Sequence, residues 1–448
     1  MKNWASMDRE QLLALPPSVD DLLPQDHLAR FVVDAVDSLD LSALLARYDA
    51  RARGSNPYHP AMMLALLFYG YTTGTMSSRR IERACRYDLA FRFIACGHAP
   101  DHDTIALFRR RHLADIPALF VQLLALAREL GLVKVGTVAI DGTKVKANAS
   151  KHAAASHKRA KQIEEELGRE VDRLMRLAEQ ADNEPIAEGL DIPAEIARRK
   201  ARIARLKEAR RAIEQRHAEE LLEQRREELE ENLAKSEKAL ADGKRPPDPP
   251  EPPPLGPPAK MQHNFTDGDS RIMPDKGAFS QAYNAQAAVD TATMLIVGHH
   301  LSQKPNDKRE LLPAIASIAE SYGTPTEVLA DAGYFSARNI AECPVDAYIA
   351  PGKTRHRRSL DDRLRRPAEG PAPAGATPAK AMRHKLDTTK GRALYRLRKM
   401  TVEPVFGIIK SAMGLRQFLL RGAEKVRGEW ALACLAYNLR RMWTLKAA

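Results

Sequence analysis

Apolar residues recur at helical spacing through the first 135 residues. The pattern is clearest in DHLARFVVDAVDSLDLSALLARY, PAMMLALLFYGYTTG and IPALFVQLLALARELGL, and two shorter amphipathic segments lie between the last two. Pro60 suits the first turn of a helix, and Gly131 suits a helix end. The pattern therefore predicts an all-α N-terminal domain over residues 1–135. A helix-turn-helix unit that binds DNA and a plain helical bundle fit it equally well.

The hydrophobic period changes at residue 136, where GTVAIDGTKVKANAS is rich in β-branched residues and partly alternates, as a strand does. Further strands are expected in FSQAYNAQAAVD, TMLIVGHHLSQ, EVLADAGYF and VDAYIAPGK. Helices are expected over residues 307–323 and over the final 60 residues, with a loop at 353–390. Strands in series, followed by alternating helix and strand, predict an α/β fold with a mixed sheet across residues 136–448.

A long charged tract interrupts this sheet. Residues 151–244 contain 43 charged residues out of 94 and no Phe, Trp or Tyr. Their apolar residues are spaced by three, four and seven, as in a coiled coil, and DNEPIAEGLDIP breaks the run in the middle. We expect two long helices folded into a hairpin that forms a satellite arm. The stiff linker RPPDPPEPPPLGPP completes the predicted insertion, residues 151–258.

The basic excess of the chain lies at one end. The formal charge is +12 over 448 residues, and residues 353–448 alone carry 23 basic and 7 acidic side chains. This asymmetry favours a polyanionic partner such as nucleic acid over a merely solvated surface. The four cysteines form no C-x-x-C pair, no segment is apolar enough to span a membrane, and the charged N-terminus makes export unexpected.

Three acids are candidates for chemistry. Asp141 lies among apolar strand residues in VAIDGTK, where burial of an acid without a partner is costly. Asp331 ends a strand in LADAGYF, where an aspartate that only caps a turn is equally expected, and Glu403 precedes Pro404 at a helix start or bend. Carboxylates without His or Cys nearby suit Mg²⁺ or Mn²⁺, and two such ions can clamp the attacking and leaving oxygens of a phosphodiester. We therefore expect the three acids to converge as catalytic residues that bind two ions.

The segments that contain these acids resemble a known family. AIDGTKVKANAS, LADAGYF and VEPVFGIIKSAMGLRQFLL resemble the catalytic blocks of DDE-type bacterial insertion-sequence transposases, and residues 58–112 resemble their N-terminal domain. The group typified by insertion sequence eleven-eighty-two is the most similar. The resemblance implies an RNase H-like catalytic core in which Asp141, Asp331 and Glu403 form the DDE triad.

The resemblance extends to the Y-R-E-K signature of these families. Tyr395, Arg398, Glu403 and Lys410 match it, and four residues separate the arginine from the glutamate where the usual pattern has three. The activity implied is cutting and joining of the ends of an insertion sequence by metal-dependent phosphodiester hydrolysis and strand transfer. The residues expected to contact DNA are Tyr395, Arg398, Lys410, Arg416, Arg421, Lys425 and Arg427.

The implied partners are the terminal inverted repeats of the element and target DNA. We also expect a homodimer or higher homo-oligomer in the bacterial cytoplasm, associated with the nucleoid when bound to DNA. No nucleotide cofactor is expected, because the chain lacks a G-x-x-x-x-G-K-[ST] loop. Asp267 and Asp269, in NFTDGDSR, suit either a turn before the next strand or an outer-shell loop beside the metals.

Three other readings compete with this one. A DNA-binding protein derived from a transposase but without catalysis would not need three intact acids. A tyrosine recombinase would use Tyr395 as nucleophile, form a covalent protein–DNA bond and need no metal. A structural coiled-coil protein leaves the strands and the acids unexplained.

Overall fold

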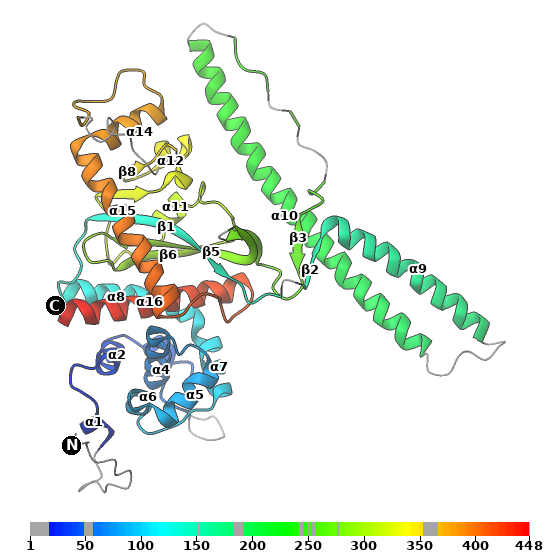
Figure 1. Ribbon diagram of the computed structural model, residues 1–448, viewed down its shortest axis with the longest axis horizontal. Helices are drawn as coiled ribbons and strands as arrows, with labels where there is room; N and C mark the ends of the chain where they lie inside the picture. The colour runs from blue at the N-terminus through cyan, green and yellow to red at the C-terminus, as the bar shows by residue number, and fades with distance from the viewer. Residues whose placement is uncertain are drawn as a thin grey trace, which may run out of the picture. The chain divides into compact units, whose positions relative to one another are not determined.

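Figure 1 shows the computed structural model of the chain, which describes residues 18–48, 57–150, 152–181, 191–241, 245–249, 251–252, 256–275, 277–352 and 366–447. The chain divides into two compact units, residues 1–145 with 283–448 and residues 146–282. The predicted insertion lies entirely within the second unit. The prediction of a mixed α/β protein with a helical N-terminal region is confirmed, and the boundary at residue 135 stays a prediction.

Helices form the N-terminal part of the first unit. His59 caps the most apolar of them, α4, with Pro60 in its first turn, and Gly74 ends it in the left-handed conformation (φ 80°). These elements are α1 (Val19–Leu22), α2 (Leu28–Asp37), α3 (Ser42–Leu45), α4 (Pro60–Thr73), α5 (Ser78–Tyr87), α6 (Leu89–Ile94), α7 (His102–His112), the 3₁₀ turn η1 (Leu113–Asp115) and α8 (Ile116–Glu129).

A six-stranded mixed sheet follows, in the order β4-β5-β1-β7-β8 with β6 paired to β5. The strand β1 runs parallel to β7, and β7 runs parallel to β8, whereas β5 pairs antiparallel with β4 and β6. The strands predicted from alternation are all present. The sequence did not predict β4. The bounds of the six strands are β1 (Thr137–Lys146), β4 (Arg271–Asp275), β5 (Ala278–Asp290), β6 (Ile296–Ser302), β7 (Glu327–Ala330) and β8 (Asp346–Ile349).

Two predictions for the segments after β6 were wrong. The helix expected over residues 307–323 is confined to α11 (Leu311–Ala316), because the chain then bridges β6 through Ala319 N–H and Val297 O. Part of the loop expected at 353–390 is a helix, α14 (Pro378–Asp387), which Thr377 caps and Pro378 begins. Residues 353–365 of that loop lie outside the described residues. The short elements η2 (Ala332–Tyr334) and α12 (Ala337–Glu342) follow β7.

The end of the chain is helical with one break. The helix α15 (Thr389–Gly407) continues into a π turn, η3 (Ile408–Ala412), and α16 (Ala423–Ala447) follows a non-helical segment that the sequence did not predict. The helix α16 is buried along most of its length and packs on α4, α8 and β6. Trp430 of α16 donates to Gln286 O on β5, and its Glu429 accepts from Tyr71 of α4. The N-terminal helices and the sheet therefore share one core.

The second unit contains a two-helix hairpin. The strands β2 (Ala154–Ser156) and β3 (Gln262–Asn264) pair antiparallel, and α9 (His157–Ala181) packs along α10 (Ile192–Ala241). A small cluster of Ala160, Leu167 and Leu206 forms its core. The predicted break lies between the two helices, and residues 182–190 are outside the described part. The two ends of this unit lie side by side, where Ala147 N–H donates to Gln281 O at 2.9 Å.

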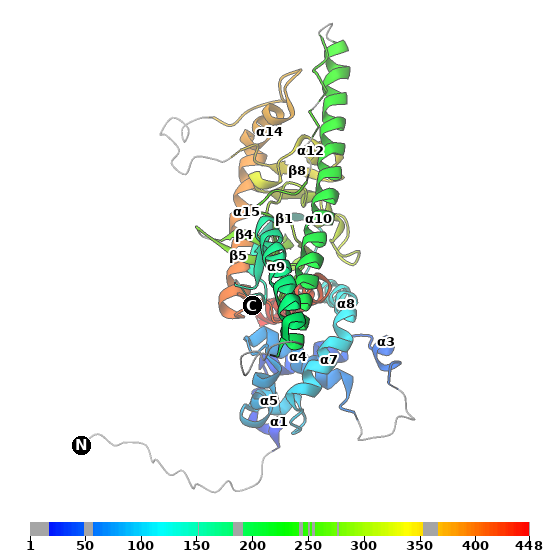
Figure 2. The same ribbon diagram turned by 90° about the vertical axis from the view of Figure 1, so that its right-hand side faces the viewer.

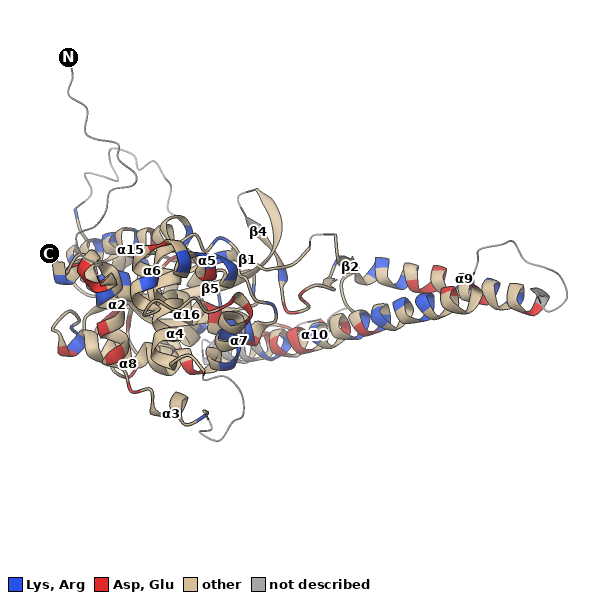
Figure 3. Ribbon diagram, turned by 90° about the horizontal axis from the view of Figure 1, so that it is seen from below, with Lys and Arg blue, Asp and Glu red and all other residues tan. Residues whose placement is uncertain are grey.

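The helix α10 is twice as long as α9, and Figure 2 shows α9 beside only part of it. Both helices carry acidic and basic residues along their length (Figure 3). In the part of α10 that extends beyond α9, four leucines are exposed: Leu222 (73%), Leu229 (49%), Leu233 (64%) and Leu240 (65%). Their spacing of seven, four and seven places them within about 40° on one face of the helix. We call these four residues the leucine stripe.

The Pro-rich return segment runs beside the leucine stripe. Arg225 donates to Glu251 O at 3.0 Å, and Asn232 donates to Asp248 O at 2.9 Å. The two donors are seven residues apart and lie about 60–80° around the helix from the stripe. Among the described segments, no helix has both the length and the apolar character needed to cross a bilayer.

Candidate active site

Asp141, inside β1, and Asp331, directly after the neighbouring parallel strand β7, lie at the same level of the sheet. Ala139 of β1 pairs with Leu329 of β7, so each aspartate lies two residues beyond a paired position. Asp141 Oδ1 accepts from Gly142 N–H at 2.8 Å, and Asp331 Oδ1 accepts from Gly333 N–H at 2.7 Å. The backbone that follows each aspartate therefore fixes its carboxylate, within β1 for Asp141 and in the turn η2 for Asp331.

Burial and neighbouring charges both act on the carboxylate of Asp141. Burial and then the negative charge of Asp331 raise the pKa of Asp141 to about 7, although Gly142 N–H and Arg398 oppose the rise. A bound cation would remove this repulsion. The fully buried Asn284 Oδ1 nearby has no hydrogen-bond partner within the described residues. Hard oxygen donors with a surplus of negative charge fit a divalent cation such as Mg²⁺.

Two members of the predicted signature lie beside these acids. Arg398 of α15 is buried, and its Nη1 lies 3.5 Å from Asp141 Oδ2. Its guanidinium carbon lies 5.9 Å from the centre of the Tyr395 ring. Burial is the largest cause that raises the pKa of Tyr395, and Asp331 and Asp141 contribute to the rise. The structure therefore brings Tyr395, Arg398, Asp141 and Asp331 together.

The signature lysine binds the strand that bears Asp141. Lys410 Nζ donates to Thr143 Oγ1 at 2.6 Å and to Lys144 O at 2.8 Å. The remaining predicted DNA contacts follow it in sequence. These exposed residues are Arg416, Arg421, Lys425 and Arg427. Buried apolar residues lie among them in the sequence, namely Leu415, Phe418 and Val426.

Glu403 is placed differently from the two aspartates. Its side chain is exposed on α15, whereas Asp141 and Asp331 are partly buried. The longer spacing explains this orientation, because a residue five positions after Arg398 is turned by about 140°, whereas one four positions after it is turned by about 40°. Within the described ranges, no three His, Cys, Asp or Glu side chains form a group that could hold a metal.

Asp267 and Asp269 form a turn inside the second unit. Asn264 Oδ1 accepts from Asp267 N–H at 3.1 Å, and Asp267 Oδ1 accepts from Asp269 N–H at 3.3 Å. Ser270 Oγ donates to Asp267 O at 2.8 Å. These bonds are those expected of the turn before a strand. An outer-shell role for the two acids stays a prediction.

Sequence reasoning missed one acid of this site, Asp307. It lies in the loop between β6 and α11, and its Oδ1 accepts from Asn284 at 2.6 Å and from Gln286 at 2.7 Å. No periodic pattern surrounds it. The signal that could have found it is the pair of amides in AYNAQAAVD, because two polar residues on one face of a buried strand need a polar partner.

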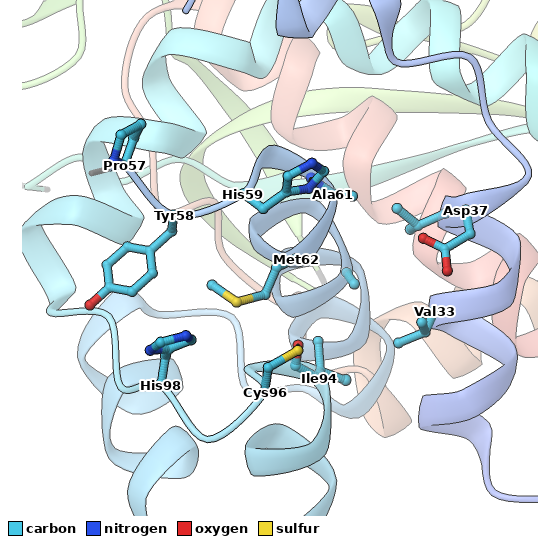
Figure 4. Close-up of a pocket in the computed structure, with 12 residues that line it drawn as sticks. Val33, Asp37, Pro57, Tyr58, His59, Ala61, Met62, Ile94, Cys96 and His98 are labelled. Atoms are coloured by element: carbon cyan, nitrogen blue, oxygen red, sulfur yellow. Dashed lines mark hydrogen bonds between the residues drawn. The ribbon is translucent and has the colours of Figure 1, made fainter. Parts of the chain in front are cut away.

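A separate cavity of about 550 Å³ lies among the N-terminal helices (Figure 4). Its lining is mainly apolar, and the rings of Tyr58 and His98 meet edge to face with their centres 5.7 Å apart. Asp37 is the one carboxylate in the lining. The residues of the acid site do not line this cavity.

Comparisons with known proteins identify two family matches. Residues 17–111 match the model of a transposase domain (DUF772), and residues 257–439 match that of a transposase DDE domain. The second match includes Asp331 and Glu403, whereas Asp141 precedes it. No curated protein and no solved structure matches the chain.

Proposed function

The chain belongs to the DDE-type transposases of insertion sequences, and we propose that Asp141 and Asp331 are the core of its DNA-cutting centre. It is a DNA transposase and a metal-dependent enzyme. The observation that supports the proposal is the position of two partly buried aspartates at one level of adjacent parallel strands, Asp141 inside β1 and Asp331 directly after β7. We propose that the site hydrolyses the phosphodiester at the ends of the element and then joins those ends to target DNA.

We propose that two divalent ions, Mg²⁺ or Mn²⁺, bind the two aspartates. When bound, such ions activate the attacking oxygen and stabilise the leaving oxygen of a phosphodiester. Arg398 orients Asp141 and limits its protonation. Glu403 is the proposed third acid, because it lies on α15 between Arg398 and Lys410, which both bind β1.

We propose that the terminal inverted repeats and the target DNA lie along the exposed basic segment after Lys410. Arg416, Arg421, Lys425 and Arg427 supply positive charge there, which suits phosphate contacts. Tyr395, Arg398 and Lys410 complete this surface next to the acids. The rival reading with Tyr395 as nucleophile is disfavoured, because burial raises the pKa of its hydroxyl beside two carboxylates.

We also infer that two copies act together, in the bacterial cytoplasm and bound to the nucleoid. The leucine stripe has the same spacing in both directions, so an antiparallel second copy would place Leu222 against Leu240 and Leu229 against Leu233. Exposed leucines at heptad spacing are typical of helices that pair. The second copy of α10 is therefore the proposed occupant of this face.

One experiment tests the proposed function. The protein is incubated with duplex DNA that carries the ends of the element, with MgCl₂ or with EDTA, and the cut strands are mapped. We expect cuts at the element ends in Mg²⁺, none in EDTA, and at least about a 100-fold lower rate for Asp141→Asn. Cleavage in EDTA, or a covalent adduct at Tyr395, would reject the metal-dependent mechanism.

A further inference from the structure

Asp307 is held in one orientation by the strand next to β1. Asn284 and Gln286 of β5 are both fully buried, and each donates its amide to Asp307 Oδ1. Lys144 Nζ lies 3.7 Å from the same oxygen. No hydrogen bond to Asp307 Oδ2 is found within the described part of the chain. Two buried amides thus fix one oxygen of the carboxylate and leave the other to face its surroundings.

Those surroundings include the glycines close to the two proposed catalytic aspartates, Gly142 in β1 and Gly333 in the turn η2. A Cβ on Gly142 would lie 2.7 Å from Asp307 Oδ1 and 2.8 Å from Asn284 Oδ1, so only glycine fits after Asp141. A Cβ on Gly333 would lie 3.7 Å from Asp307 Oδ2 and 2.9 Å from Asp331 Oδ1. Asp307 therefore lies beside both glycines, with its Oδ1 near Gly142 and its Oδ2 near Gly333.

The negative charge of Asp307 changes the pKa of a neighbouring side chain. After burial, it is the largest cause that raises the pKa of Tyr334, whose hydroxyl donates to Gln286 Oε1. Asn284 Oδ1 is a fully buried acceptor for which no donor is found among the described residues. Such an acceptor is costly unless a cation or a water binds it, so it is a second observation that favours a bound group in this region.

We propose that Asp307 is a further acid of the metal centre, a positioning residue that strengthens divalent-cation binding by Asp141 and Asp331. This inference rests on the proposed metal-dependent function. The negative charge of Asp307 adds to theirs, and its fixed carboxylate packs against Gly142, the residue after Asp141 in β1. Changes to residues that support metal ligands reduce metal affinity by about 10–100-fold.

The test measures Mg²⁺ binding apart from catalysis. Full-length protein is titrated with MgCl₂ and its thermal unfolding is followed, with EDTA as the metal-free reference. We expect Asp307→Asn to raise the Mg²⁺ concentration for half-maximal stabilisation by about tenfold. Its melting temperature in EDTA should not fall, because asparagine keeps an oxygen for the two amides and the repulsion between acids is reduced. Asp103→Asn, at an aspartate that is 92% exposed, is the matched control and should change neither value.

Lys144→Met should change the Mg²⁺ affinity in the opposite direction from Asp307→Asn. It removes the cation beside Asp307 Oδ1, so we expect half-maximal stabilisation at a Mg²⁺ concentration several-fold lower than in the wild type. A merely structural role for Asp307 would lower the melting temperature in EDTA and leave the Mg²⁺ dependence unchanged, which would overturn the proposal. If Asp307→Asn does not fold, an unchanged Mg²⁺ dependence in Lys144→Met would also overturn it.

The controls separate this inference from the proposed function. A wild-type response to Mg²⁺ that Asp141→Asn abolishes and Asp307→Asn leaves intact would reject the role of Asp307 alone. A wild-type protein that does not respond to Mg²⁺ and cuts DNA in EDTA would reject both.

Discussion

At the scale of single residues, Glu403 is the acid whose contribution is easiest to isolate. Its side chain is exposed on α15, so its replacement should not disturb the fold. We expect Glu403→Gln to reduce strand cleavage by about 100-fold or more, because the metal site loses one negative charge. Binding to end DNA should stay within about twofold of wild type. Cleavage at near wild-type rate would exclude Glu403 from the catalytic set.

The check compares cleavage and mobility-shift binding at several salt concentrations. Glu424→Gln, at an exposed glutamate of α16, is the control for loss of one surface charge. Lys410→Ala should act differently, because Lys410 binds β1 and is proposed to meet phosphate. Loss of one phosphate contact flattens the log–log salt dependence of binding by about 0.9.

His299 should make the stability of the protein depend on pH. Burial, with a smaller contribution from His300, lowers its pKa from 6.5 to about 4. Between these values the unfolded chain binds a proton that the folded chain does not, so stability falls as pH falls through this window. We expect this residue to account for a loss of about 2 kcal/mol between pH 7.5 and 5.

Urea unfolding of wild type and His299→Leu at the two pH values isolates this effect, because the other titrating groups are common to both proteins. The variant should lose about 2 kcal/mol less than wild type on acidification. Equal losses in both proteins would show that His299 is protonated without cost in the folded state.

At the scale of elements, the hairpin should be dispensable for the folding of the first unit. The apolar cluster at its base is small and lies within the second unit. We expect replacement of residues 151–244 by a short Gly-Ser linker to leave one cooperative unfolding transition, within a few degrees of the wild-type melting temperature. Scanning calorimetry measures this directly. Disappearance of the transition would mean that the hairpin contributes to the main core.

The leucine stripe on α10 should hold two copies together. We expect the double variant Leu229→Glu/Leu233→Glu to shift the protein from dimer to monomer in sedimentation experiments at micromolar concentration, because charges in the centre of a helix pair oppose association. Leu130→Glu, at a leucine of similar exposure in the first unit, is the control and should leave the dimer intact. An unchanged sedimentation coefficient for the double variant would reject this interface.

At the scale of the whole molecule, one buried glutamate joins distant parts of the first unit. Glu429 accepts from Tyr71 of α4 and from the backbone N–H groups of Leu419 and Leu420, and burial raises its pKa. We expect Glu429→Ala to reduce the free energy of unfolding by about 3 kcal/mol, since Arg109 nearby would lose its anion. Tyr71→Phe should cost about 1 kcal/mol. Urea denaturation checks both, and a loss below about 1 kcal/mol for Glu429→Ala would contradict this role.

The sequence predicts the parts of this molecule that follow a regular pattern. Alternation located β1, β5 and β6, and the position of Asp141 inside one strand and of Asp331 at the end of another indicated that the two acids could converge. It did not locate α14, because its Pro- and Ala-rich surroundings resemble a loop, and it overestimated α11, because the bridge to β6 competes with the helix. Asp307 acquires its place from Asn284 and Gln286, a tertiary contact that leaves no local pattern.

The backbone bond between Ala147 and Gln281 has a consequence for how such proteins diversify. The chain leaves and re-enters the main fold at two points about 5 Å apart, as paired strand residues are. Any folded module whose termini lie equally close could be inserted there without changing the pairing of the strands that follow. The position is therefore a natural exchange site, where evolution or an engineer could swap one appendage for another.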